Sequence, residues 1–116
     1  VSTDAAAFLV EQIKTHPSKL TLVALGPLTN LAQALTLDPA IAKQVVEVVI
    51  MGGNAFCSGN ATPAAEANIL ADPDAADQVL GADWPVTMIG LDVTHRVNMK
   101  GDILKLLSKL DGALAQ

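Results

Sequence analysis

Three polar side chains lie close together in the segment GNATPAAEANILADPDAA, which covers residues 59–76. Asn60, Glu66 and Asn68 are set there among alanine, proline and isoleucine residues. Carboxamides donate and accept hydrogen bonds and a carboxylate accepts them, so the group suits the hydroxyls of a sugar. If the segment is extended, Glu66 and Asn68 point to the same side. A second interpretation stays open, in which Asn60 caps the loop, Glu66 is solvated and Asn68 bonds the local backbone.

Two glycine-containing turns are further candidates. The first, GPLTN at 26–30, could place a helix N-terminus near an anion or strand-end carbonyls near a metal. Spacing alone favours a plain turn here, in which Thr29 and Asn30 satisfy the helix donors. The second, Met51-Gly52-Gly53, could allow the backbone to approach a ligand closely or could be a turn that needs positive φ. Spacing alone leaves the alternatives for the second turn open.

The remaining reactive side chains have less support. His95 follows Asp92 at a spacing that need not bring the two side chains together in a strand, so a structural histidine is favoured over a general base. Cys57 is the only cysteine and has no neighbouring histidine, which indicates a small loop residue. No cysteine or histidine pair has zinc-ligand spacing, and the common nucleotide-phosphate fingerprints are absent.

Composition excludes several classes of protein. The 116 residues carry a net charge of −5 without a basic stripe, so nucleic acid is not an expected partner. No apolar run is long enough to span a membrane, and no membrane partner is expected. The lone cysteine fits a reducing, cytoplasmic location. The composition is 51% hydrophobic, an excess that would suit a homo-oligomer.

Helical and apolar segments alternate along the chain. This pattern predicts an α/β fold with a mainly parallel sheet. The strands are nearly all apolar, which is typical of a sheet covered by helices on both faces. Ligands bind such sheets at the carboxyl ends of the strands, where the turns at Gly26 and Gly52 lie. Helices are predicted at 3–14, from 28, from 39 behind the cap Asp38, at 72–80 and at 99–110, strands at 20–25, 45–51 and 85–91, and a loop at 54–71.

Three blocks in order resemble the nucleoside hydrolases, the inosine-uridine preferring N-ribohydrolase family. They are LVALGPLTNLAQAL, VVIMGGNAFCSGNATPAAEANILADPDAA and PVTMIGLDVTH. The resemblance covers about 22–97 and implies a Rossmann-like α/β fold that hydrolyses the N-glycosidic bond of ribonucleosides. It further implies an oxocarbenium-like transition state, a calcium ion that holds the ribose diol and the attacking water, and an aspartate that takes the proton from this water.

The resemblance assigns roles to five residues. Asn60, Glu66 and Asn68 match the residues that bind the ribose hydroxyls, and Glu66 would place negative charge near the developing cation. Met51 matches a residue that lies against the ribose. Leu25 matches a position whose backbone carbonyl binds calcium, for which any side chain is compatible.

One departure from the family pattern is large. The aspartate-rich segment that supplies most calcium ligands and the catalytic base is not in these 116 residues and is expected upstream of Val1. Residues 1–116 are therefore expected to be the central segment of a single nucleoside hydrolase domain, inactive when isolated. Two alternatives stay open: a non-catalytic ribose- or nucleoside-binding α/β module, and a generic α/β domain whose loop residues are structural.

Overall fold

Three parallel strands form the sheet in the computed structural model, which describes residues 4–98, 100–107 and 109. They are β1 (Thr21–Ala24), β2 (Glu47–Met51) and β3 (Val86–Ile89), with β2 in the centre. Leu22 is in register with Val48, and Val48 with Val86. The mainly parallel α/β architecture predicted from the sequence is confirmed, and β1 and β2 begin and end within two residues of the predicted limits.

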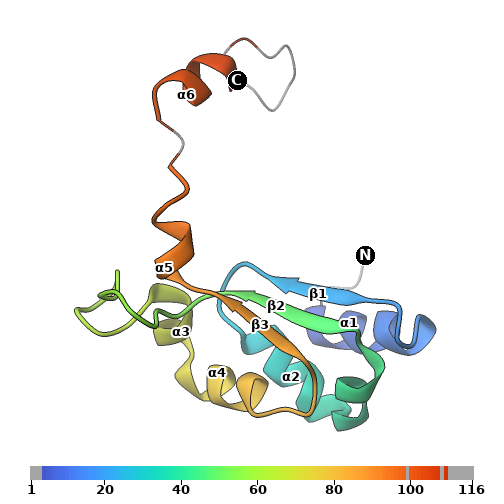
Figure 1. Ribbon diagram of the computed structural model, residues 1–116. Coiled ribbons are helices and arrows are strands. Elements are labelled where there is room, and N and C mark those ends of the chain that lie inside the picture. The colour runs from blue at the N-terminus through green and yellow to red at the C-terminus, as the bar shows by residue number, and fades with distance from the viewer. Residues whose placement is uncertain (1–3, 99, 108, 110–116) are drawn as a thin grey trace.

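Helices cover one face of this sheet (Figure 1). They are α1 (Ala5–Thr15), α2 (Thr29–Leu37), the 3-10 helix η1 (Pro39–Gln44) and α4 (Pro73–Leu80). Helix α2 packs between α1 and α4, and the core lies between these helices and the sheet. On the other face Val23 is 63% exposed. The expectation that helices cover both faces is therefore wrong for the part of the chain that the structure describes.

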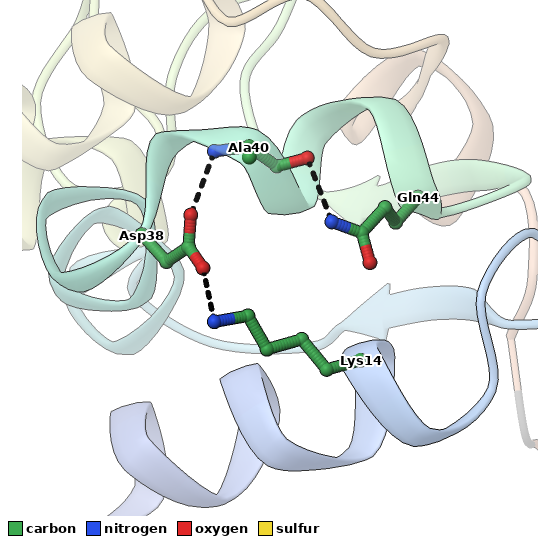
Figure 2. Close-up of polar contacts among 4 residues, drawn as sticks. All are labelled: Lys14, Asp38, Ala40 and Gln44. Atoms are coloured by element: carbon green, nitrogen blue, oxygen red, sulfur yellow. Dashed lines mark hydrogen bonds and ion pairs between the residues drawn. The ribbon is translucent and has the colours of Figure 1, made fainter.

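Asp38 organises the connection between α2 and β2. Its carboxylate accepts a hydrogen bond from the Ala40 amide at 3.0 Å and lies 2.5 Å from the Lys14 ammonium of α1 (Figure 2). Both contacts hold the pKa of Asp38 below its usual value, Lys14 more than Ala40. The predicted cap is confirmed, but the helix that follows is of the 3-10 type. A six-residue connection that leads directly into a strand suits this tighter helix.

Asp72 connects two helix N-termini. It caps α4 by accepting from the Ala75 amide at 3.1 Å, as the Asp-Pro pattern predicts. It also accepts from the Thr29 hydroxyl at 2.5 Å, at the start of α2. Thr29 therefore does not satisfy the donors of its own helix, whose N-cap Leu28 makes no side-chain hydrogen bond. The turn after β1 and the start of α4 are held together by this contact.

Three boundaries differ from the sequence predictions. Helix α3 (Ala67–Ala71) occupies the end of the predicted loop. The third strand ends at Ile89, because Gly90 is already the N-cap of α5 (Leu91–Thr94). Helix α6 (Asp102–Leu107) lies within the last predicted helix, whose limits at Met99 and Leu110 fall outside the described residues. No helix among the described residues is both long and apolar enough to cross a bilayer.

We expect Ile50→Ala to lower the free energy of unfolding by about 2–5 kcal/mol, because it opens a cavity in the core. Ile50 is fully buried at the centre of the sheet, whereas Val46, which precedes the same strand, is 50% exposed. Val46→Ala is the matched control and should change the free energy by less than about 1 kcal/mol. Denaturant titration measures both, and equal losses would contradict the assignment of the core.

Candidate functional site

The polar segment singled out in the sequence lies at the carboxyl ends of the strands. Figure 1 shows β2 leading into the loop that reaches α3, and β3 leading into α5 beside it. The turn after β1 is at the same end of the sheet. This is the edge where parallel α/β sheets bind ligands.

Glu66 is a buried carboxylate at the start of α3. Its side chain is 2% exposed. One oxygen, Oε1, accepts from the Asn68 amide at 2.9 Å, and Oε2 accepts from the amides of Gly53 and Ile69 at 3.0 and 3.1 Å. The interpretation in which Glu66 is solvated is therefore wrong. The residue is the N-cap of α3 and also holds the turn that ends β2.

Gly53 adopts a conformation that few other residues could take. Its φ is +73°, and a Cβ there would lie 2.9 Å from the Met88 sulfur. The positive-φ interpretation of the Gly52-Gly53 turn is thereby confirmed. The conformation turns the Gly53 amide toward Glu66, while its carbonyl accepts from the Leu91 amide at 2.9 Å.

Asn60 is held in a narrow turn before α3. A Cβ on Gly59 would lie 2.2 Å from the Ala65 carbonyl oxygen, so this close approach requires glycine. The Asn60 Oδ1 accepts from the Ala67 amide at 2.9 Å. Asn60 therefore caps the loop, and its amide NH₂ has no recorded hydrogen-bond partner among the residues that the structure describes.

Asn68 lies in the first turn of α3, so the segment is not extended and the condition under which Glu66 and Asn68 would point to the same side is not met. Its Nδ2 donates to the Met51 carbonyl at 3.0 Å and lies 3.3 Å from the Met51 sulfur. Met51 and Asn68 are thus in direct contact, and the Oδ1 of Asn68 has no hydrogen bond recorded to any described residue. The structure brings Asn60, Glu66, Asn68 and Met51 together around one short helix.

Polar capacity is left at this helix after the internal hydrogen bonds are made. Glu66 accepts from three amides within hydrogen-bond distance, and the Ala67 amide also lowers its pKa, so its roughly four lone-pair positions are taken up inside the protein. The Asn60 NH₂ can donate and the Asn68 Oδ1 can accept. A donor and an acceptor beside a charged carboxylate together match a ligand with several hydroxyl groups.

Leu25 lies apart from this group, immediately after β1. With Gly26, Pro27 and Asn30 it lines a cavity of about 470 Å³ beside the strand. Its side chain is 76% exposed. Within the described ranges no three histidine, cysteine or acidic side chains cluster as a metal site would require. The structure therefore shows a strand-end carbonyl beside a cavity.

The family model described as "Inosine-uridine preferring nucleoside hydrolase" matches residues 1–116. The chain belongs to this family. It is 49% identical over 109 residues to a probable uridine nucleosidase 2 of Arabidopsis thaliana, and covers 34% of that protein. A pyrimidine-specific ribonucleoside hydrolase of Escherichia coli O17:K52:H18 is 39% identical over 111 residues, with 35% covered. The match takes in 94% of this chain in the first case and 96% in the second.

Solved nucleoside hydrolases have the same fold over nearly the whole chain. A plant nucleoside hydrolase superimposes with a TM-score of 0.93 at 40% identity, covering 99% of this chain and 36% of that one. A purine-preferring ribonucleoside hydrolase from Gardnerella vaginalis gives a TM-score of 0.93 at 36% identity, with the same shares covered. The chain thus spans about a third of the length of the relatives that it matches.

Asp92 is a residue whose contacts the sequence did not reveal. Its carboxylate accepts hydrogen bonds from the main-chain amides of Ala55 and Phe56. Among the described residues, no hydrogen bond joins the Asp92 side chain to His95. His95 is exposed at the end of α5, so no Asp–His pair for general-base chemistry forms in this region. The sequence signal for a role of Asp92 was its position just after the end of a strand.

Glu66 is ionised over the whole neutral range. Burial raises the pKa of its carboxyl, but hydrogen bonds from the amides of Asn68, Gly53, Ile69 and Ala67 outweigh burial and lower it below the usual value. Since the folded pKa is the lower one, the stabilisation is complete above the ordinary glutamate pKa of about 4.3. It is lost as the pH falls from there through the folded pKa.

We expect Glu66→Gln to lower the free energy of unfolding at pH 7 by roughly 1.5–3 kcal/mol, because a neutral amide accepts more weakly and sets an NH₂ against backbone donors. Below the folded pKa the two proteins should converge in stability. Denaturant titrations at several pH values measure both effects. A constant difference down to pH 2 would contradict the ionised state of Glu66, and Glu11→Gln on the exposed side of α1 is the control.

Proposed function

We propose that the protein hydrolyses the N-glycosidic bond of ribonucleosides and that this chain supplies the ribose-binding residues. Water adds its hydroxyl to C1′ of the ribose, and the base leaves with a proton. The observation that supports the proposal is the group of polar atoms around α3. Asn60 and Asn68 are fixed there by internal hydrogen bonds and still have capacity for hydroxyl groups, with the charged carboxylate of Glu66 between them in the sequence.

The ribose contacts of the two asparagines follow from the hydrogen bonds that each side chain has left. The Asn60 NH₂ donates to a ribose hydroxyl, for which the 5′ group is the family expectation. The Asn68 Oδ1 accepts from a ribose hydroxyl. Glu66, for which the family resemblance implies a ribose contact, would share a lone pair that already accepts from a main-chain amide. Met51, whose sulfur and carbonyl contact Asn68, lies against the sugar ring. The rigid hydrogen bonds behind these atoms would orient the ribose at little entropic cost.

Glu66 also contributes to the transition state through its charge. Positive charge develops on the ribose as the glycosidic bond breaks, and an ionised carboxylate in a poorly solvated position stabilises it. The main-chain hydrogen bonds that lower the pKa of Glu66 keep this charge present at neutral pH. The charge is therefore in place before the bond breaks, and no proton has to move to create it.

Calcium is the proposed metal, and the chain fits it only in part. Calcium takes six to eight oxygen ligands at roughly 2.3–2.6 Å, backbone carbonyls among them. The Leu25 carbonyl is one candidate oxygen, at the end of β1 and beside a cavity. The other oxygens, and the base that accepts the proton from water, would come from outside these 116 residues. Bound calcium would lower the pKa of the attacking water.

Uridine is the first substrate to test, because relatives 49% and 39% identical are named a probable uridine nucleosidase and a pyrimidine-specific hydrolase. We expect Asn60→Asp to raise KM for uridine by about tenfold. This is the effect of losing one hydrogen bond whose free energy lies at the upper end of the usual range. Aspartate keeps the acceptor for the Ala67 amide but cannot donate to the ribose.

Steady-state kinetics of the whole enzyme, with circular dichroism to check folding, measures this effect. Asn98→Asp makes the same chemical change at an exposed position and should leave KM unchanged. An Asn60→Asp enzyme with unaltered KM would argue against ribose binding by Asn60. Uridine that binds without being cleaved would instead favour the non-catalytic binding module.

Calcium dependence has its own test. Chelation with EGTA should abolish hydrolysis, and added calcium should restore it. We expect Leu25→Ala to change the calcium dissociation constant by less than about threefold, because only the backbone carbonyl is a ligand. Isothermal titration of calcium into the chelated enzyme measures this. A large loss of affinity in Leu25→Ala, with the fold intact, would contradict binding through the carbonyl.

A further inference from the structure

Asp92 connects two segments that are far apart in the sequence. Its Oδ2 accepts from the Ala55 amide at 2.7 Å and its Oδ1 from the Phe56 amide at 2.8 Å. The Cys57 thiol also hydrogen-bonds to this carboxylate. One carboxylate thus binds three consecutive residues of the loop after β2. This contact requires a carboxylate, because both of its oxygens accept hydrogen bonds. An asparagine at this position would place its NH₂ group against one of the backbone N–H donors.

Further hydrogen bonds connect this contact to the ribose-binding group. The Asn54 side chain donates to the Cys57 carbonyl at 2.8 Å and to the Ala64 carbonyl at 3.2 Å, across the loop. The adjacent Ala65 carbonyl accepts from the Ala61 amide at 3.1 Å and packs on Gly59. Asn60 lies between these two residues. A continuous set of contacts therefore runs from α5 to Asn60.

We propose that Asp92 is a positioning residue, which sets the affinity for the ribonucleoside by fixing the loop at 54–60 and, through it, Asn60. The inference rests on the proposed function for its ligand. The Asp92 carboxylate binds two main-chain amides and the thiol of this loop, and Leu91 beside it donates to the Gly53 carbonyl at 2.9 Å. The loop at 54–60 is thereby held to β3 and α5 as well as to β2, from which it emerges.

The loop contact predicts a local change that can be measured without substrate. Burial and, after it, the charge of Asp92 raise the pKa of the Cys57 thiol, so the thiol reacts slowly at neutral pH. In Asp92→Asn the charge is gone and the loop is released. We expect alkylation of Cys57 by iodoacetamide to accelerate at least about threefold, measured on the Cys57 peptide by mass spectrometry of the whole protein.

The substrate part of the inference is tested by a double-mutant cycle in the whole enzyme. Asp92→Asn should raise KM for uridine by about tenfold and lower kcat by less than about threefold. In the Asn60→Asp background the same change should raise KM by less than about threefold, because both substitutions act on one contact. A merely structural role would give independent, multiplicative effects. Asp77→Asn, on the exposed side of α4, is the control for both measurements.

The outcomes separate the two proposals. Unchanged Cys57 alkylation, or unchanged KM, in Asp92→Asn would overturn the role of Asp92 while hydrolysis by the unmodified enzyme left the proposed function intact. If the unmodified enzyme, saturated with calcium, cleaves no ribonucleoside, the proposed function fails and the substrate part of this inference fails with it. Multiplicative effects in the cycle would assign Asp92 to general stability instead.

Discussion

The buried carboxylate of Glu66 is the contact on which the arrangement of the site depends. A helix of five residues such as α3 is too short to form on helix propensity alone, since nucleation is costly. Glu66 accepts from two amides in its first turn and from Gly53 at the end of β2. It therefore defines where α3 begins and fixes the helix to the strand. Asn68 reaches the Met51 carbonyl only because α3 starts at this point.

The hydrogen bonds that stabilise Glu66 also determine its chemistry. Burial of a carboxylate without partners would raise its pKa and neutralise it. Three or more main-chain donors reverse that effect and keep the charge. The donors that hold this charge occupy the carboxylate from inside the protein. The structural role of Glu66 and its proposed role toward the ligand are compatible through its charge, which acts without a free lone pair.

Local signals in the sequence predicted the frame of the molecule. The apolar runs predicted the strands. The Asp-Pro pairs predicted the helix caps Asp38 and Asp72, because a cap depends on residues within one helical turn. Helix α3 was missed because glutamate is not a usual N-cap and the loop before it hides the helix start. The Asp92 contact joins residues 36 and 37 positions apart, which no local pattern records. The assignment of Asn60, Glu66 and Asn68 to ribose binding rests on family resemblance and stays a proposal, whereas spacing alone left their role ambiguous.

Three acidic side chains hold the carboxyl edge of the sheet in a similar way. Glu66, Asp72 and Asp92 each lie at or near the start of a helix. Asp72 and Asp92 also bind a segment that follows another strand, and Glu66 binds the turn that follows β2, the strand before it. Glu66 joins α3 to the turn after β2, Asp72 joins α4 to the turn after β1, and Asp92 joins α5 to the loop after β2. The pKa of each is lowered by these hydrogen bonds, so all three are charged at neutral pH. The core beneath these three side chains is apolar, so its packing does not depend on charge. The geometry of the site is consequently set by electrostatic contacts at its edge, while the stability of the sheet is set by packing beneath it.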